Sequence, residues 1–274
     1  MKEPDEEKEP SGKRFLTGVE IEELKTLTPR FRTGFPEIDS HIDGGILTGS
    51  FVEIYGSQWA GKTLMCTQIG VINHSMGDVL WYDSEGTFRE NTVREIAFRM
   101  DLDPESILRK FHVVRFLEEM SIEVLSEDLW GRLNTEEICL IVIDSLSKTK
   151  SILKGSPHMS DILKVLGQIR AKTDTTLLFT SRASVLVSGT TEQDRESRTS
   201  RAVSDMTDFR IMIEPTGEHE RRLVLEDSIS FPEGEWMVSL GYGGLYPDDR
   251  SMKLQERRVK RYLSRLRSSK DSNL

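Results

Sequence analysis

The sequence predicts an α/β fold, in which a mainly parallel twisted sheet carries helices on both faces and antiparallel strands form its C-terminal edge. Short apolar segments alternate with segments of helical periodicity between about residues 32 and 248. Continuous apolar strands of this kind are typical of a parallel sheet that helices cover on both sides. After residue 208, strand-like segments follow one another without helices between them, which indicates antiparallel pairing.

The individual elements follow from local patterns in chain order. The clearest helix covers residues 159–172, where Ile162, Leu163, Leu166 and Ile169 form one apolar stripe. Pro-Thr-Gly and Pro-Glu-Gly triplets at 215–217 and 232–234 mark turns between the late strands. The predicted strands are 51–55, 78–83, 111–115, 138–144, 175–180, 209–213, 222–225 and 236–240, and the other predicted helices are 62–74, 91–100 and 121–133.

Length and composition exclude several classes of protein. The 274 residues, with 36% hydrophobic and 30% charged residues, fit one large globular domain with extensions, or two small domains. The longest unbroken apolar run, at 138–143, is far shorter than a membrane helix requires. This excludes an integral membrane protein, and we expect no membrane among the partners. Cys66 and Cys139 are the only cysteines, which excludes a disulfide scaffold and fits a cytoplasmic protein. The acidic first ten residues do not resemble a secretory signal.

Charge is distributed unevenly along the chain. Residues 250–274 contain nine Lys/Arg and two Asp/Glu, a net charge of +7 in a chain of −9. We expect a disordered acidic tail at 1–14, an assembly motif and linker at 15–31, a core at 32–248, and a basic helix or tail at 249–274. In that last segment Val259, Tyr262, Leu263 and Leu266 recur at helical spacing. This helix could dock on the acidic body, bind a partner or membrane surface, or contact phosphate backbones.

The strongest motif is a phosphate-binding loop. Residues 56–63 match G-x-x-x-x-G-K-[ST] between a predicted strand and a predicted helix, which is the context that this motif requires. Two glycines let the backbone N–H groups surround a phosphate. Lys62 is expected to reach the β- and γ-phosphates of ATP, and the Thr63 hydroxyl to bind Mg²⁺. The predicted cofactor-binding loop comprises Gly56, Ser57, Gln58, Trp59, Ala60, Gly61, Lys62 and Thr63.

Two carboxylates complete the predicted site. Asp144 ends the buried strand 138–144 and is expected to be the Walker B residue on the metal side. Glu85 follows the strand 78–83 and is the candidate that orients the attacking water. A turn-forming role for Asp144, or a solvated loop position for Glu85, is the structural alternative.

The sequence resembles the RecA/RadA recombinase family, in its archaeal and eukaryotic branch, from about residue 15 to residue 246. Residues 83–89, Asp-Ser-Glu-Gly-Thr-Phe-Arg, are similar to the family segment that carries the catalytic glutamate, which implies that role for Glu85 and places Arg89 at the nucleotide. Residues 227–235 resemble the cap that closes over a neighbouring subunit's ATP, which implies cofactor contacts for Asp227 and Pro232. Residues 15–18 look like the assembly motif, so Phe15 is expected to contact a second copy or a recombinase, unless it packs locally. The resemblance implies a P-loop NTPase core of the RecA type.

The chain also departs from that family. A helix-hairpin-helix domain normally precedes the assembly motif, and only about 14 residues do so here. The adenine-stacking arginine falls on Thr92, and the γ-phosphate sensor glutamine falls on Arg182. The first DNA loop is short and has Lys148, Lys150 and Lys154 as its basic residues. The predicted DNA contacts are Lys154 and, in or just after the second loop at 183–200, Arg195, Arg198 and Arg201; the alternative for that loop is a plain surface segment.

With these departures, the sequence resembles an accessory RadA paralogue of the RadB-like type. The resemblance implies an ATP-binding, slowly hydrolysing protein of recombination and DNA repair that acts on single-stranded DNA or assists a recombinase. One alternative is a nucleotide-switched regulatory ATPase, similar to KaiC, that acts through protein contacts without DNA. Another is a competent recombinase whose DNA loops differ from the usual pattern.

Overall fold

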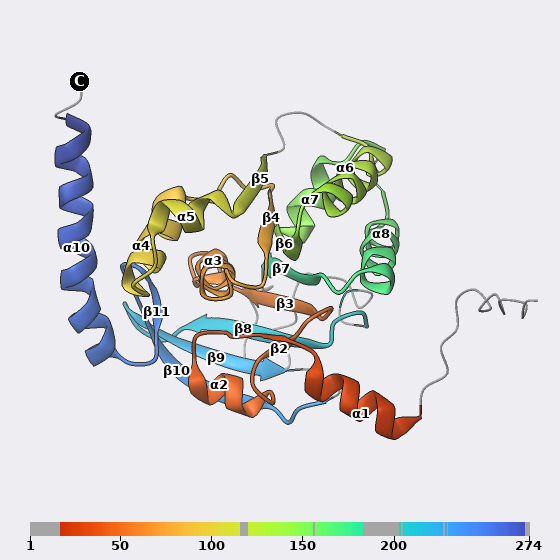
Figure 1. Cartoon of the computed structure of the whole chain (residues 1–274), viewed down its shortest axis with the longest axis horizontal. Coiled ribbons are helices and arrows are strands. Elements are labelled where there is room, and N and C mark those ends of the chain that lie inside the picture. The colour runs from red at the N-terminus through yellow and green to blue at the C-terminus, as the bar shows by residue number, and fades with distance from the viewer. Residues whose placement is uncertain are drawn as a thin grey trace, which may run out of the picture.

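The computed structural model describes residues 17–115, 120–155, 157–182, 203, 205–226, 228 and 230–271. Its elements in chain order confirm the predicted α/β fold (Figure 1). The first half comprises α1 (Gly18–Leu27), β1 (Arg30–Phe31), α2 (Pro36–His41), β2 (Ile46–Leu47), β3 (Phe51–Gly56), α3 (Lys62–Ile72), β4 (Asp78–Asp83), α4 (Glu90–Arg99), α5 (Pro104–Arg109) and β5 (Phe111–Arg115). The second half comprises α6 (Ile122–Thr135), β6 (Ile138–Asp144), α7 (Leu146–Ile152), α8 (Met159–Lys172), β7 (Thr176–Arg182), β8 (Phe209–Pro215), β9 (Glu220–Glu226), β10 (Gly234–Gly241), β11 (Gly244–Tyr246) and α10 (Asp249–Asp271).

Within the described residues the main sheet has nine strands, in the order β11-β10-β9-β8-β3-β7-β6-β4-β5. The six strands from β8 to β5 pair in parallel, and β9, β10 and β11 extend this sheet antiparallel at one edge. Ligands of open α/β sheets bind at the carboxyl ends of the parallel strands. The central strands β3, β7, β6 and β4 therefore define where a site is expected.

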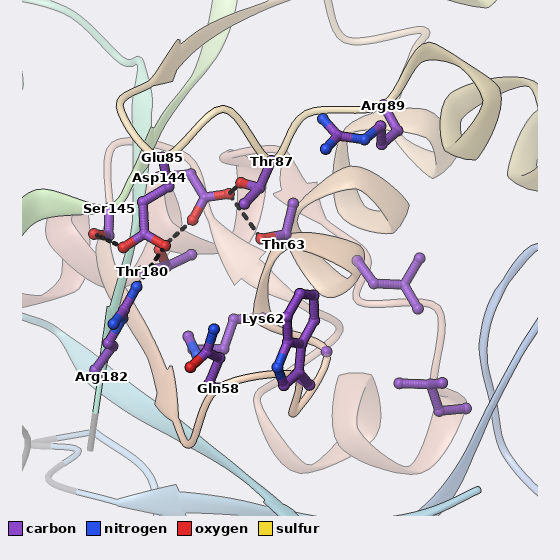
Figure 2. A pocket seen from close by; sticks show the side chains of 14 residues that line it. Gln58, Lys62, Thr63, Glu85, Thr87, Arg89, Asp144, Ser145, Thr180 and Arg182 are labelled. Atoms are coloured by element: carbon purple, nitrogen blue, oxygen red, sulfur yellow. Dashed lines mark hydrogen bonds and ion pairs between the residues drawn. The ribbon is translucent and has the colours of Figure 1, made fainter. Parts of the chain in front are cut away.

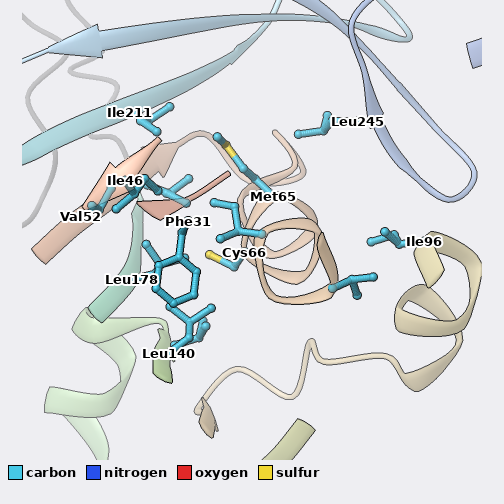
Figure 3. Packing of buried hydrophobic residues seen from close by; sticks show 14 of the residues in the cluster. Phe31, Ile46, Val52, Met65, Cys66, Ile96, Leu140, Leu178, Ile211 and Leu245 are labelled. Atoms are coloured by element: carbon cyan, nitrogen blue, oxygen red, sulfur yellow. The ribbon is translucent and has the colours of Figure 1, made fainter. Parts of the chain in front are cut away.

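Side chains of each central strand alternate between two hydrophobic clusters. In β6, Leu140 and Val142 join the cluster under α3 and α4, whereas Ile141 and Ile143 join the cluster under α6 and α8. Figure 3 shows the first cluster, in which Met65 and Cys66 of α3 lie among side chains of the sheet. This alternation explains why the strands contain continuous apolar runs, since both of their faces are buried.

Several short elements were not predicted. The segment 15–31, expected to be an assembly motif and linker, contains helix α1, which begins with a capping box between Thr17 and Glu20. Helices α2, α5 and α7 have six or seven residues each, too few for a helical period to stand out in the sequence. The predicted helix 62–74 ends at Ile72, where Asn73 caps it.

The basic C-terminal segment forms helix α10, whose first half packs on the body. Met252 and Val259 are buried there, and Tyr262 stacks on Phe98 of α4 with ring centroids 4.2 Å apart. Arg258 pairs with Asp101, just after the end of α4. These contacts support the docked-helix alternative for this half. Among the described residues, no helix combines the length and apolar character needed to cross a membrane.

Candidate nucleotide site

The phosphate-binding loop joins β3 to α3, as the motif predicts. A Cβ atom on Gly56 would lie 2.2 Å from the carbonyl oxygen of Ile213, so no larger residue fits there. Gly61, the N-cap of α3, has φ +114°, which L-residues with side chains rarely adopt. Both glycines are therefore required by the backbone path, and the first turn of α3 faces the space where the loop would surround a phosphate.

Lys62, the first residue of α3, lies inside this loop. Its ammonium donates hydrogen bonds to the carbonyl oxygens of Gly56, at 3.1 Å, and Ser57, at 2.8 Å. Burial lowers the pKa of Lys62, and the nearby carboxylates Asp144 and Glu85 oppose this shift. The ammonium is thus partly removed from water and available to an anion at the loop.

Asp144, at the end of β6, accepts hydrogen bonds from three hydroxyl groups. Its Oδ2 accepts hydrogen bonds from Thr63, at 2.7 Å, and Thr87, at 2.9 Å, while its Oδ1 accepts one from Thr180, at 2.5 Å (Figure 2). Burial raises the pKa of Asp144, against the effect of these three bonds. A carboxylate and hydroxyl oxygens are hard donors of the kind that Mg²⁺ prefers. The residues present at Asp144 and Thr63 therefore fit the predicted metal.

Glu85 lies beside Asp144 but has different partners. Its Oε1 accepts a hydrogen bond from the Ser145 hydroxyl at 2.7 Å, and its Oε2 accepts one from the Arg182 guanidinium at 3.1 Å. Figure 2 shows Arg182 extending from the end of β7 toward Glu85. Although partial burial acts in the opposite direction, the bonds from Ser145 and Arg182 lower the pKa of Glu85. The carboxylate is therefore ionised at neutral pH and held by a cation.

The loop that carries Glu85 is fixed by Asp83. This buried carboxylate ends β4 and accepts hydrogen bonds from the backbone N–H groups of Thr87, at 2.9 Å, and Phe88, at 3.2 Å. The Phe88 ring packs edge-on against Trp81, with centroids 5.2 Å apart. These contacts explain how the Asp-Ser-Glu-Gly-Thr-Phe-Arg segment returns toward α3 after leaving the sheet.

These groups surround a pocket of about 350 Å³. The Trp59 side chain, 82% exposed, lies at its edge on a residue with φ +67°. Arg89 lines the same pocket, and its guanidinium donates to the carbonyl oxygen of Gly86 at 2.7 Å. The described lining residues are Gln58, Trp59, Gly61, Lys62, Thr63, Leu64, Glu85, Thr87, Arg89, Asp144, Ser145, Thr180, Arg182 and Leu240. The pocket thus brings together most of the predicted ATP-site residues.

Other predicted site residues lie elsewhere. Pro232 is exposed before the start of β10, where its carbonyl oxygen is 2.8 Å from His41, and it is not among the described residues that line this pocket. Lys154 is exposed after α7. Phe15, Asp227, Arg195, Arg198 and Arg201 lie outside the described residues.

The sequence analysis missed several residues of the site: Thr87 and Thr180, which bond Asp144, and two others. Ser145 is one, and its position directly after the predicted Walker B aspartate was the available signal. Arg221 of β9 is the other: this buried residue donates from Nε to the carbonyl oxygen of Ala60 at 3.0 Å and so supports the phosphate loop. Since 161 residues separate the two partners, no local pattern could have indicated this contact. Burial lowers the pKa of Arg221.

The sheet order, the glycine loop and the carboxylates at the ends of β4 and β6 define a class of protein, the P-loop NTPases with a RecA-type core. Comparison with protein families agrees with this class and narrows it. The Rad51 family model matches residues 25–248. The chain therefore belongs to the Rad51 family.

The individual relatives share low sequence identity with this chain. The chain is 24% identical over 264 residues to the DNA repair and recombination protein RadA of Cenarchaeum symbiosum, covering 91% of this chain and 66% of that protein. It is 30% identical over 145 residues to the RadA protein of Metallosphaera sedula, covering 49% and 44%. It is 28% identical over 233 residues to the meiotic recombination protein DMC1 of Saccharomyces cerevisiae, covering 78% and 70%. The chain thus spans less than two thirds of either RadA relative.

Proposed function

We propose that the pocket binds ATP with Mg²⁺ and hydrolyses it slowly. Lys62 would contact the β- and γ-phosphates, and Thr63 and Asp144 would hold the metal ion, which when bound supplies positive charge opposite the phosphate oxygens. Glu85 would act as the general base that orients and polarises the attacking water. Arg182 would lie near the γ-phosphate, in the position of the family sensor.

The hydrogen bonding of Glu85 is the observation that carries this proposal. The groups assigned to the phosphates and the metal ion lie together at the loop. In contrast, the carboxylate assigned to hydrolysis is bonded to both Ser145 and Arg182. A carboxylate that a cation holds is a weaker base than a free one, because its ionised form is stabilised. This arrangement supports tight binding with slow turnover in the isolated chain.

We further propose that the chain acts in homologous recombination and DNA repair as a RadB-like accessory paralogue. The printed names of its RadA and DMC1 relatives refer to DNA repair and to recombination. In this role it would act on single-stranded DNA, or assist a recombinase or another paralogue, and Phe15 would mediate contact with that partner or with a second copy. Lys154, Arg195, Arg198 and Arg201 would contact DNA phosphates, and Asp227 and Pro232 would close over a neighbour's ATP.

Binding of single-stranded DNA tests this role directly. Fluorescence anisotropy with a labelled oligo(dT), at several salt concentrations and with or without a non-hydrolysable ATP analogue, should show salt-dependent binding. Lys154→Ala should make the negative slope of log K against log salt shallower by about 0.7, the contribution of one single-strand phosphate. Lys164→Ala is the matched control, since Lys164 is 75% exposed on α8. A wild-type chain that binds no oligonucleotide in either nucleotide state would contradict the DNA role.

A further inference from the structure

The residues assigned to the phosphates, the metal ion and the attacking water line only part of the nucleotide pocket. The apolar lining residues Trp59, Leu64 and Leu240 have no ligand in that assignment. Leu64 lies in the first turn of α3, directly after Thr63. Leu240 of β10 lies against the phosphate loop, since a Cβ atom on Gly61 would be 3.1 Å from its Cδ1 atom. The pocket therefore combines a charged part with an apolar part.

Trp59 is the most exposed tryptophan of the chain. Its side chain is 82% exposed, whereas Trp81 is fully buried and Trp130 and Trp236 are half-buried. Tryptophan side chains are highly buried on average, because they have a large apolar surface. Among the described residues, no aromatic ring or cation stacks on the Trp59 indole. The indole is therefore available to a ligand of the pocket.

The backbone at Trp59 also indicates a functional position. Its φ of +67° lies in the left-handed region, which residues with side chains rarely adopt. Glycine adopts this conformation without strain. Backbone strain of this kind is concentrated at ligand sites, where the surrounding structure holds it. Because tryptophan occupies a position that glycine would fit better, we infer that the indole itself has a role.

The chemistry of the apolar part suits a nucleobase. A nucleoside triphosphate continues from its phosphates to a ribose and an aromatic base, and a base binds well against an aromatic or apolar surface. Trp59 is the only aromatic residue among the described lining residues. Leu64 and Leu240 add aliphatic surface beside it. This part of the pocket thus fits the portion of the nucleotide that the charged part leaves unbound.

Arg89 is the other candidate for a flat surface beside the base, because a guanidinium can also stack on a ring. Figure 2 shows Arg89 on the opposite side of Thr63 from Arg182, away from the hydrolytic carboxylate. Its Nη1 donates to the carbonyl oxygens of Gly86, at 2.7 Å, and Phe88, at 2.8 Å. These bonds tie the guanidinium to its own loop. The Trp59 indole has no such tie and is the flat surface available to a base.

We propose that the indole of Trp59 stacks on the base of the bound nucleotide, and that Leu64 and Leu240 contact the base or the ribose beside it. This inference rests on the proposed ATP site and adds the residues that bind the nucleoside. An indole contacts the face of a base and not its hydrogen-bonding edge. The stack therefore raises the affinity for adenine and guanine nucleotides alike.

The first test identifies the part of the ligand that Trp59 contacts. In Trp59→Ala, isothermal titration calorimetry should show an affinity for a non-hydrolysable ATP analogue that is lower by about tenfold, the scale of one base–aromatic stack. The corresponding GTP analogue should lose affinity by the same factor. Inorganic tripolyphosphate with Mg²⁺ has no base, so its affinity should change by less than about twofold. Trp59→Phe keeps a ring that can stack and should bind the ATP analogue within about threefold of wild type.

Two further variants control for the loop and for the loss of an exposed ring. Trp59→Gly accepts φ +67° without strain, so a base-dependent loss shared by Trp59→Gly and Trp59→Ala does not come from a distorted loop. Tyr242 is 53% exposed in the turn between β10 and β11 and is not among the described lining residues of the pocket. Tyr242→Ala should leave the affinity for all three ligands unchanged.

Tryptophan fluorescence reports the stack directly, since a base stacked on an indole quenches its emission. The ATP analogue should quench the emission of the wild-type chain. In Trp59→Phe, which keeps Trp81, Trp130 and Trp236, the quench should be lost although the analogue still binds. Tripolyphosphate should quench neither protein. A quench that persists in Trp59→Phe would contradict the stack.

The outcomes separate this inference from the proposed function. If Lys62→Ala binds the ATP analogue and tripolyphosphate as the wild type does, the loop is not the ATP site and both fail. If Lys62→Ala loses both ligands while Trp59→Ala keeps wild-type affinity for the analogue, the ATP site stands and this inference fails. Equal losses for the analogue and tripolyphosphate in Trp59→Ala would also overturn it. So would a loss of self-association at unchanged nucleotide affinity, which would identify the indole as a contact to a second copy.

Discussion

The two ends of the nucleotide pocket are built differently. At the phosphate end, Gly56, Gly61 and Lys62 follow the family motif, and each is fixed by backbone geometry or by short hydrogen bonds. At the hydrolytic end, Glu85 is paired with Arg182, a residue that replaces the family glutamine. At the first end Gly56 is buried and Gly61 and Lys62 are partly buried, whereas the Arg182 side chain at the second end is 50% exposed.

We infer that this difference separates ATP binding from ATP hydrolysis. In the proposed function, the phosphate loop allows the isolated chain to bind ATP, because its donors need no rearrangement. An exposed ion pair contributes little to stability and is easily exchanged for another partner. The hydrolytic end can therefore respond to a ligand that the phosphate end does not sense.

The largest expected effect is at the phosphate end. Lys62→Ala removes the ammonium that would face the phosphates and should weaken ATP binding by at least about 100-fold, or 2.7 kcal/mol. Isothermal titration calorimetry with a non-hydrolysable analogue measures this, and Lys164→Ala serves as the control. Retention of wild-type affinity in Lys62→Ala would show that the loop is not the ATP site.

At the hydrolytic end, Ser145→Ala removes one of the two hydrogen bonds to Glu85. We expect DNA-free turnover to fall by about tenfold, because the base loses its orientation. The bond from Ser145 helps to lower the pKa of Glu85, so its loss raises that pKa. Since the base acts in its ionised form, the acid limb of the pH–rate profile should move to higher pH. Ser147→Ala, which lacks a bond to Glu85, should show neither change.

Arg182→Gln restores the family residue and tests the ion pair. Release of Glu85 should raise turnover without DNA by about threefold, while ATP affinity changes less than this. Steady-state kinetics with saturating ATP gives the comparison. A fall in turnover would instead mean that the guanidinium assists the γ-phosphate more than it restrains Glu85.

The smallest effect should come from the support behind the phosphate loop. Arg221→Met leaves the Ala60 carbonyl oxygen without its donor, and we expect ATP affinity to fall by about twofold to threefold. Because Arg221 is buried and hydrogen-bonded, the free energy of unfolding should also fall, by about 1–3 kcal/mol. An unchanged melting temperature would show that this contact does not hold the loop.

The phosphate end could be predicted from the sequence because its parts are local. Gly56 to Thr63 are consecutive, and the buried strand before Asp144 identifies the metal side. The pairing of Glu85 with Arg182 joins residues 97 positions apart and depends on β6 lying between β4 and β7. Strand order is set by tertiary packing, which the hydrophobic pattern does not encode.

The contacts of the C-terminal helix could likewise be predicted only in part. Its apolar spacing predicted a stripe through Val259 and Tyr262, and the structure confirms that this stripe contacts the body. The partner of the stripe, Phe98 on α4, could not be predicted, because nothing in the sequence relates the two helices. The sequence therefore left docking, partner binding and phosphate binding open, and the contacts of α10 with and beside α4 support docking for its first half.

The most direct test of the separation between binding and hydrolysis is the Glu85→Gln variant, measured for ATP affinity and turnover on the same preparation. The account predicts an affinity within about threefold of wild type and a turnover lower by roughly 10²-fold, because glutamine keeps the shape of the side chain but cannot act as a base. Equal losses of affinity and turnover, or a turnover close to wild type, would contradict the assignment of Glu85 and the division of the pocket into two ends.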